Sequence, residues 1–81
     1  MPNRAAAVVE FDVDLMRHDI AAKGWLPTDL ARRAKVSDMA VSNFLRGRYQ
    51  NPRTALKLAR ALGYRSVRRY LVVRPVEQEV V

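Results

Sequence analysis

Glycine punctuation limits this chain more than any other feature of its sequence. Its three glycines, Gly24, Gly47 and Gly63, each follow a segment in which apolar residues recur at helical spacing. Because glycine readily adopts the left-handed conformation that ends a helix, each is expected to be a helix stop. The segments between these stops are short. The chain is therefore predicted to fold into short helices joined by tight turns.

Two helices are expected before residue 35. The first covers about residues 12–23 and carries apolar residues at i, i+3 and i+7, the spacing of one helix face. The second covers residues 27–34 and begins with proline, whose missing N–H would be unpaired at that position anyway. Leu26 precedes this proline and is therefore expected in an extended conformation. The apolar line of the first helix consists of Val13, Met16 and Ile20.

The segment between Ser37 and Gly47 is predicted to be the third helix. Ser37 is a favourable N-cap, and Asp38 lies in the first turn, where the helix dipole favours a carboxylate. The two faces of this helix differ in character. Its apolar face consists of Ala40, Val41, Phe44 and Leu45. Its opposite stripe consists of Asp38, Met39, Ser42, Asn43 and Arg46.

The fourth helix has the clearest boundaries, because Asn51 is a good cap, proline follows it and Gly63 ends the apolar pattern. A fifth, shorter helix is expected over about residues 66–71. The β-branched tail beyond it is expected to be extended or β. Its apolar residues are expected to pair as a strand, either with a partner chain or with the early segment AAAVVEF (5–11). The resulting divisions are an N-terminal arm (1–11), a domain (12–72) and a tail (73–81).

The charge distribution indicates a polyanionic partner. The chain of 81 residues has a net charge of +7 and a pI near 10.8. Between Lys23 and Arg74 thirteen Lys or Arg stand against two acids, Asp29 and Asp38, a balance of +11. Such a bias is typical of nucleic-acid-binding domains, and small ribosomal proteins and membrane-surface helices share it.

Other features argue against an enzyme or a metalloprotein. The chain has no cysteine and one histidine, so thiolate and zinc sites lack ligands. The early acids Asp12, Asp14 and Asp19 are interpreted as an acidic, solvated first helix. The early apolar run AAAVV is too short for a signal peptide core or a membrane span. We therefore expect no catalytic function, cofactor, metal, small-molecule ligand or membrane contact.

The second and third helices, joined by the turn at residues 35–37, form a helix-turn-helix candidate. From about residue 15 to residue 71 the sequence resembles the lambda-repressor-like (Cro/C1-type) helix-turn-helix family, which includes phage Cro and repressor proteins and their bacterial relatives. The resemblance is carried in order by KGW, LA (30–31), VS (36–37), VS (41–42), RG (46–47) and TALKLARALG. It implies an all-α, compact five-helix domain whose third helix enters the DNA major groove. It also fits a phage or bacterial source.

By position, the resemblance implies two sets of contacts with double-stranded DNA. The base-reading residues would be Asp38, Met39, Ser42 and Asn43. The phosphate-binding residues would be Thr28, Lys35, Arg46, Gly47 through its amide, Arg48 and Arg53. The alternative interpretation is that the stripe on the third helix is a solvated surface.

Four positions depart from the family pattern. Pro27 stands where the family usually has glutamine, so Thr28 is expected to take over its phosphate contact. Lys35 replaces the turn glycine, and a left-handed lysine costs roughly 1 kcal/mol. Asp38 and Met39 replace the usual polar pair. An aspartate can accept from cytosine N4 and a methionine suits a thymine methyl, so the expected specificity differs from that of the well-known relatives.

The leading hypothesis is a sequence-specific transcription regulator, a repressor that acts as a homodimer on a pseudo-palindromic operator. It would be cytoplasmic and nucleoid-associated. One alternative is an antitoxin-like interaction protein whose tail binds a partner protein, and another is non-specific nucleoid packing. Dimerisation is expected through the fifth helix or the tail. The candidate dimerisation residues are Tyr70, Leu71, Val73 and Val76.

Overall fold

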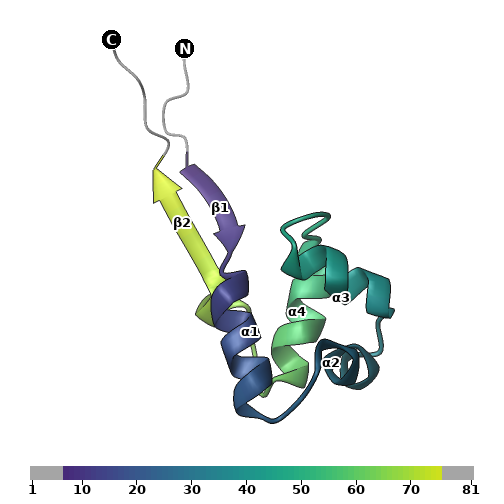
Figure 1. Cartoon of the computed structure of the whole chain (residues 1–81). Helices are drawn as coiled ribbons and strands as arrows, with labels where there is room; N and C mark the ends of the chain where they lie inside the picture. Colours follow the sequence, from purple (N-terminus) through teal and green to yellow (C-terminus); the bar gives the residue numbers. More distant parts are fainter. Residues whose placement is uncertain (1–6, 76–81) are drawn as a thin grey trace.

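Four α-helices and one two-stranded sheet make up residues 7–75, the part of the chain that the computed structural model describes (Figure 1). The elements are β1 (Ala7–Phe11), α1 (Val13–Ala22), α2 (Pro27–Ala34), α3 (Asp38–Leu45), α4 (Pro52–Ala61), a 3-10 turn (Arg68–Tyr70) and β2 (Leu71–Pro75). The helices pack together, and the two strands lead away from them on the α1 side (Figure 1).

Polar side chains close the first turn of every helix. In α1, α3 and α4 the N-cap side chain accepts a backbone N–H of the first turn at 2.7–3.0 Å. These caps are Asp12, Ser37 and Asn51. In α2, which begins with Pro27, the Asp29 carboxylate instead accepts the Leu26 N–H at 2.8 Å. The predicted starts of the four helices and the predicted caps Ser37 and Asn51 are confirmed, whereas the capping roles of Asp12 and Asp29 were not predicted.

The helix ends follow one backbone pattern. In each of the four, the two N–H groups beyond the last turn donate back to helix carbonyls, which is the Schellman motif. Glycine occupies its left-handed position after α1, α3 and α4. After α2 the same position is Lys35, with φ 62° and ψ 43°. The predicted left-handed lysine is confirmed, and its strain costs about 1 kcal/mol.

The core lies between the four helices. Side chains that are at most 9% exposed form a single cluster, and each large one contributes roughly 1.5–3 kcal/mol of burial free energy. The predicted inward faces are confirmed, although Val13 and Ala40 are only half-buried. The cluster consists of Met16, Ile20, Leu30, Ala31, Ala34, Val41, Phe44, Leu45, Ala55, Leu58, Ala59, Leu62 and Tyr70.

The predicted fifth helix is wrong, and with it the all-α, five-helix description. Within residues 7–75 the only helical structure after α4 is the 3-10 turn Arg68–Tyr70. The next residue, Leu71, already belongs to β2. The β-branched residues that follow favour a strand, and a pairing partner is in reach, because the Asp12 N–H donates to the Tyr70 carbonyl at 2.6 Å. The class of the fold is mostly helical with a small sheet.

The small sheet joins the two ends of the described chain. Strands β1 and β2 are antiparallel, with Ala7 opposite Pro75, Val9 opposite Val73 and Phe11 opposite Leu71. One of the two predicted pairings of the tail, that with residues 5–11, is therefore confirmed within this chain. Strand β2 also runs across residue 72, the predicted boundary between domain and tail.

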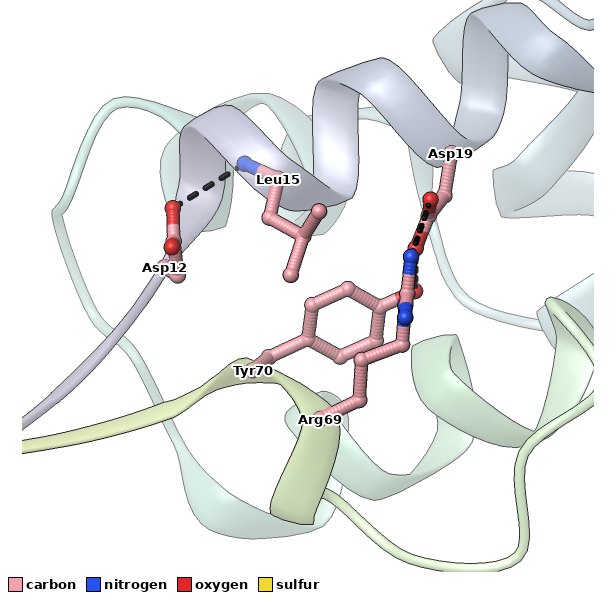
Figure 2. A network of polar contacts seen from close by, with 5 residues as sticks. All are labelled: Asp12, Leu15, Asp19, Arg69 and Tyr70. Carbon is pink, nitrogen blue, oxygen red and sulfur yellow. Dashed lines mark hydrogen bonds and ion pairs between the residues drawn. The ribbon is translucent and has the colours of Figure 1, made fainter.

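Asp19 is not a solvated acid as predicted. It is 8% exposed and lies on the side of α1 that faces the 3-10 turn (Figure 2). Its Oδ2 accepts the Arg69 Nε–H at 2.7 Å and the Tyr70 hydroxyl at 2.6 Å, and its Oδ1 accepts Arg69 Nη2–H at 2.9 Å. The sequence around Asp19 could not indicate this buried hydrogen-bonding role, because both partners lie about fifty positions away in the chain.

This network also corrects the prediction for Tyr70. Its side chain is fully buried, so it belongs to the core and offers no surface to a second chain. Burial first, and then the hydrogen bond to Asp19, raise the pKa of the Tyr70 hydroxyl. The Arg69 hydrogen bonds hold the pKa of Asp19 below its usual value despite its burial. The network therefore ties α1 to the segment that leads into β2.

Candidate nucleic-acid interface

The outer face of α3 is built by the turn before it and the core beneath it. The left-handed Lys35 reverses the chain after α2, and the Ser37 hydroxyl accepts the Ala40 N–H at 3.0 Å to start α3. Val41 and Phe44 are buried and fix the rotation of the helix about its axis. Because these two side chains share one face of the helix and point into the core, the opposite face points away from it.

The four predicted base-reading residues lie on that outer side. Met39 is 65% exposed although it is a large apolar side chain, and Asp38 is exposed beside it. Ser42 and Asn43 are half-buried one turn further on. Within residues 7–75 the Asp38 carboxylate has neither a hydrogen bond nor an ion pair. The stripe thus presents polar and apolar groups that the fold itself does not use.

A hollow of about 300 Å³ adjoins this stripe, between α1, α2 and α3. It brings together four residues that the sequence predicted as DNA contacts, two from each set. These are Thr28, Asp38, Ser42 and Arg46. Pro27 and Leu45 complete the wall, together with Arg17 of α1.

Arg17 was missed by the sequence reasoning. Its Nη2–H donates to the Leu45 carbonyl at 3.0 Å, which links α1 to the last turn of α3. The separation of twenty-eight positions leaves no local pattern that could reveal this contact. The only available signal was its charge, since it is the one arginine in an otherwise acidic helix.

Two more of the predicted phosphate-binding residues follow α3, Arg48 in the turn between α3 and α4 and Arg53 in the first turn of α4. Arg48 and Arg53 are exposed, and neither side chain forms an ion pair in the described part of the chain. Between them, Tyr49 is 82% exposed and has a positive φ of 47°. The Gln50 amide donates to the Phe44 carbonyl at 3.0 Å and so anchors this turn to the end of α3.

The prediction for Gly47 needs correction. Its N–H donates to the Phe44 carbonyl at 3.0 Å, so the amide closes α3 and is not free for a phosphate. With φ at 82°, Gly47 ends the helix, and its contribution to the interface is to aim the turn that follows.

Lys35 lies apart from the other predicted phosphate-binding residues. It borders a second hollow, also of about 300 Å³, between α2 and α4. Four cationic side chains line this hollow, and no acidic residue lines it. They are Arg33, Lys35, Lys57 and Arg60. Lys35 is therefore not brought together with Thr28 and Arg46.

Trp25 is half-buried, and two cationic side chains lie over its ring. The Arg33 guanidinium lies 4.3 Å from the centre of its ring, and the Lys23 ammonium lies 5.3 Å from it. Such cation–π contacts contribute about 0.5–1 kcal/mol at exposed sites. These contacts keep the Lys23 and Arg33 charges close to the Trp25 ring.

The predicted dimerisation residues fall into three groups. Leu71 and Val73 are exposed at 37% and 58%, and both lie on β2. Tyr70 is buried, as described above. Val76 lies outside the described residues.

Two features are absent from the described residues. No helix within residues 7–75 is long and apolar enough to cross a membrane. In the same stretch, no group of three or more His, Cys, Asp or Glu side chains is placed to hold a metal ion.

With this geometry in place, the chain can be compared with known families. The model of the helix-turn-helix family matches residues 19–68, which is more than half of the chain. The chain therefore belongs to the helix-turn-helix family, and the resemblance to lambda-repressor-like proteins is confirmed. Membership makes it a DNA-binding transcription regulator. A comparison with curated proteins and with solved structures finds no match.

Proposed function

We propose that this regulator is a repressor that reads a specific double-stranded DNA sequence through α3 and acts as a dimer on a pseudo-palindromic operator. The observation that carries this proposal is the outer side of α3. There, an exposed Met39 stands beside an unpaired Asp38 on a helix whose rotation is fixed by its buried face. An exposed apolar group beside a carboxylate that has no hydrogen bond or ion pair within residues 7–75 is suited to base edges.

Each base-reading residue has a chemically distinct partner in the major groove. The Asp38 carboxylate accepts from cytosine N4, and the Met39 side chain packs on a thymine methyl. The Asn43 amide suits the N6 and N7 of adenine, while the Ser42 hydroxyl suits either a donor or an acceptor. Each such contact discriminates against a wrong base by about 1–3 kcal/mol when the geometry is good.

Phosphate contacts would flank this helix on both sides. Thr28 and Arg46 border the hollow beside α3, and Arg48 and Arg53 flank the turn after it. Lys35, at the turn before α3, would reach phosphate from its own side. These contacts set the register of α3 on the duplex and carry no sequence information themselves.

The dimer would place two copies of α3 in successive major grooves about 34 Å apart, so that half-sites lie roughly 10 bp centre to centre. Leu71 and Val73, with Val76, are the proposed contacts between protomers. The exposure of Val73 and the open edges of the two-stranded sheet support this, because such a ribbon is marginal on its own. Blocking of polymerase is the simplest repression mechanism, and the site of action would be the cytoplasmic nucleoid.

The test is selection of bound sites from a random pool of double-stranded DNA at about 150 mM salt, where backbone attraction is damped. We expect an inverted repeat with half-sites about one turn apart. Met39→Ala and Asn43→Ala should each relax a different position of that repeat. Leu26→Ala is the matched control, because Leu26 is apolar and 66% exposed but lies outside α3.

Two results would contradict the proposal. Selection of a single half-site would remove the dimer while keeping the reading helix. Recovery of no motif, with weak and uniform binding, would sink sequence-specific reading altogether and direct attention to a protein partner of the tail.

A further inference from the structure

We infer that Arg17 of α1 binds a phosphate of the DNA backbone, so that the first helix takes part in the interface. The inference rests on the proposed function, because it concerns the same bound duplex. It adds a residue that lies on neither member of the helix-turn-helix.

The Arg17 side chain is held at one of its N–H groups. One of its N–H groups donates to the Leu45 carbonyl at 3.0 Å. An arginine side chain has five N–H donors, and within residues 7–75 the other four have no acceptor. One N–H group therefore anchors the side chain, and the other four are open to a ligand. This ordering lowers the entropy that a ligand contact would otherwise cost.

Arg17 shares its hollow with a second arginine, a hydroxyl group and a carboxylate. Arg46 and the Thr28 hydroxyl border the same space of about 300 Å³. Asp38 borders it too, yet it forms no ion pair with either arginine. Two cations thus converge on an open space next to a carboxylate that neutralises neither. A cleft lined by cations that have no ion pair of their own within residues 7–75 attracts an anion.

The anion that suits this hollow is a phosphate. Guanidinium groups bind phosphate oxygens through paired N–H donors, which gives both charge and directional matching. The hollow adjoins Ser42 and Asp38, so a phosphate there would belong to the backbone beside the groove that α3 occupies. Pro27, at the same wall, has no N–H to offer. Arg17 is the side chain by which α1 adds donors to this wall.

The test compares three variants in a salt series on the selected operator and on random-sequence duplex. Arg17→Gln removes the charge and keeps a donor for the Leu45 carbonyl, whereas Arg17→Lys keeps the charge. Arg65→Gln is the matched control, since Arg65 is exposed in the segment after α4 and does not line the hollow. Thermal unfolding of each variant accompanies the binding curves.

For Arg17→Gln we expect the affinity to fall about tenfold near 150 mM salt, the size of one charged hydrogen bond. The slope of log affinity against log salt should become shallower by about 0.9 for each bound protomer. Arg17→Lys should keep most of the slope, and Arg65→Gln should change it little. A role confined to holding the end of α3 would move the unfolding temperature and not the slope.

An unchanged slope in Arg17→Gln overturns the inference, whatever happens to stability. Failure of the proposed function looks different. If the wild-type protein prefers no sequence but loses salt dependence in Arg17→Gln, then Arg17 binds phosphate and specific reading is wrong. A wild-type protein that binds neither duplex contradicts both.

Discussion

Asp19 and Asp38 are both aspartates on short helices, and their surroundings are opposite. Asp19 on α1 is buried and accepts three hydrogen bonds from Arg69 and Tyr70 (Figure 2). Asp38 on α3 is exposed, and its carboxylate has no partner within residues 7–75. The arginines beside them differ too, because Arg69 is paired with Asp19, whereas Arg46, which lines the same hollow as Asp38, has no ion pair within residues 7–75. A charge that is buried with its partner stabilises the fold, and an exposed charge without a partner remains available to a ligand.

The largest effect is expected when Asp19 loses its carboxylate. Asp19→Ala leaves the fully buried Tyr70 hydroxyl without an acceptor, so the free energy of unfolding should fall by about 2 kcal/mol. Urea or thermal unfolding measures this. Asp14→Ala is the control, because Asp14 is an exposed aspartate on the same helix. Equal losses in both variants would mean that the network adds nothing beyond surface charge.

The same network predicts a dependence of stability on pH. Because the pKa of Asp19 is lower in the folded chain than its unfolded value of about 3.9, the unfolded state binds the proton first as the pH falls. The contribution of Asp19 is therefore complete above about pH 5 and is lost as the pH falls below about 4. The raised pKa of Tyr70 acts at the other end: its contribution is complete below about pH 10 and is lost as the pH rises further.

Asp19→Asn isolates the acid limb of this dependence. The difference in unfolding free energy between wild type and Asp19→Asn should be constant between about pH 5 and 8, and should shrink as the pH falls below about 4. Urea unfolding at a series of pH values measures it. A difference that stays constant down to pH 2.5 would show that the carboxylate has the same pKa in both states.

The four helices could be predicted from sequence because their signals are local. Ser37, Asn51 and the glycine stops act within one turn of their own position, and the apolar spacing needs no knowledge of the fold. The segment at 66–71 has no such stop or cap of comparable strength. Its structure depends on β1, whose residues lie about sixty positions earlier and can only be paired once the helices have brought them together.

The candidate site divides in the same way. The outer stripe of α3 follows from helix periodicity and was predicted residue by residue. Arg17 and Asp19 were not, because their partners, Leu45 and Tyr70, come from distant segments. The free Gly47 amide was also a wrong expectation. In a Schellman motif the N–H of the glycine that ends the helix donates to a helix carbonyl. This rule could have excluded a phosphate contact by the Gly47 amide from the sequence alone.

Lys35 is a second charge without an ion pair within residues 7–75, and its left-handed conformation also strains the backbone. Lys35→Gly relieves the left-handed strain and should raise the free energy of unfolding by about 1 kcal/mol. The same change removes a proposed phosphate contact, so the affinity for DNA should fall and its salt dependence should weaken. Unfolding and binding measured on one preparation would show the two effects with opposite signs. Lys35→Ala is the control, since it removes the charge and keeps the strain.

The smallest effect is expected at the one exposed ion pair of α2. Arg32 Nη1 lies 3.6 Å from Asp29 Oδ1, with the two side chains 74% and 32% exposed. Such a pair contributes about 0–0.5 kcal/mol, so Arg32→Ala should leave the unfolding free energy almost unchanged. Asp29→Ala should cost about 1 kcal/mol, because the same carboxylate accepts the Leu26 N–H at 2.8 Å and closes the start of α2. Urea unfolding of both variants separates ion pair from cap. If Arg32→Ala lowers the unfolding free energy as much as Asp29→Ala does, the exposed ion pair itself stabilises α2. Burial would then no longer distinguish the Asp19 network from an exposed pair.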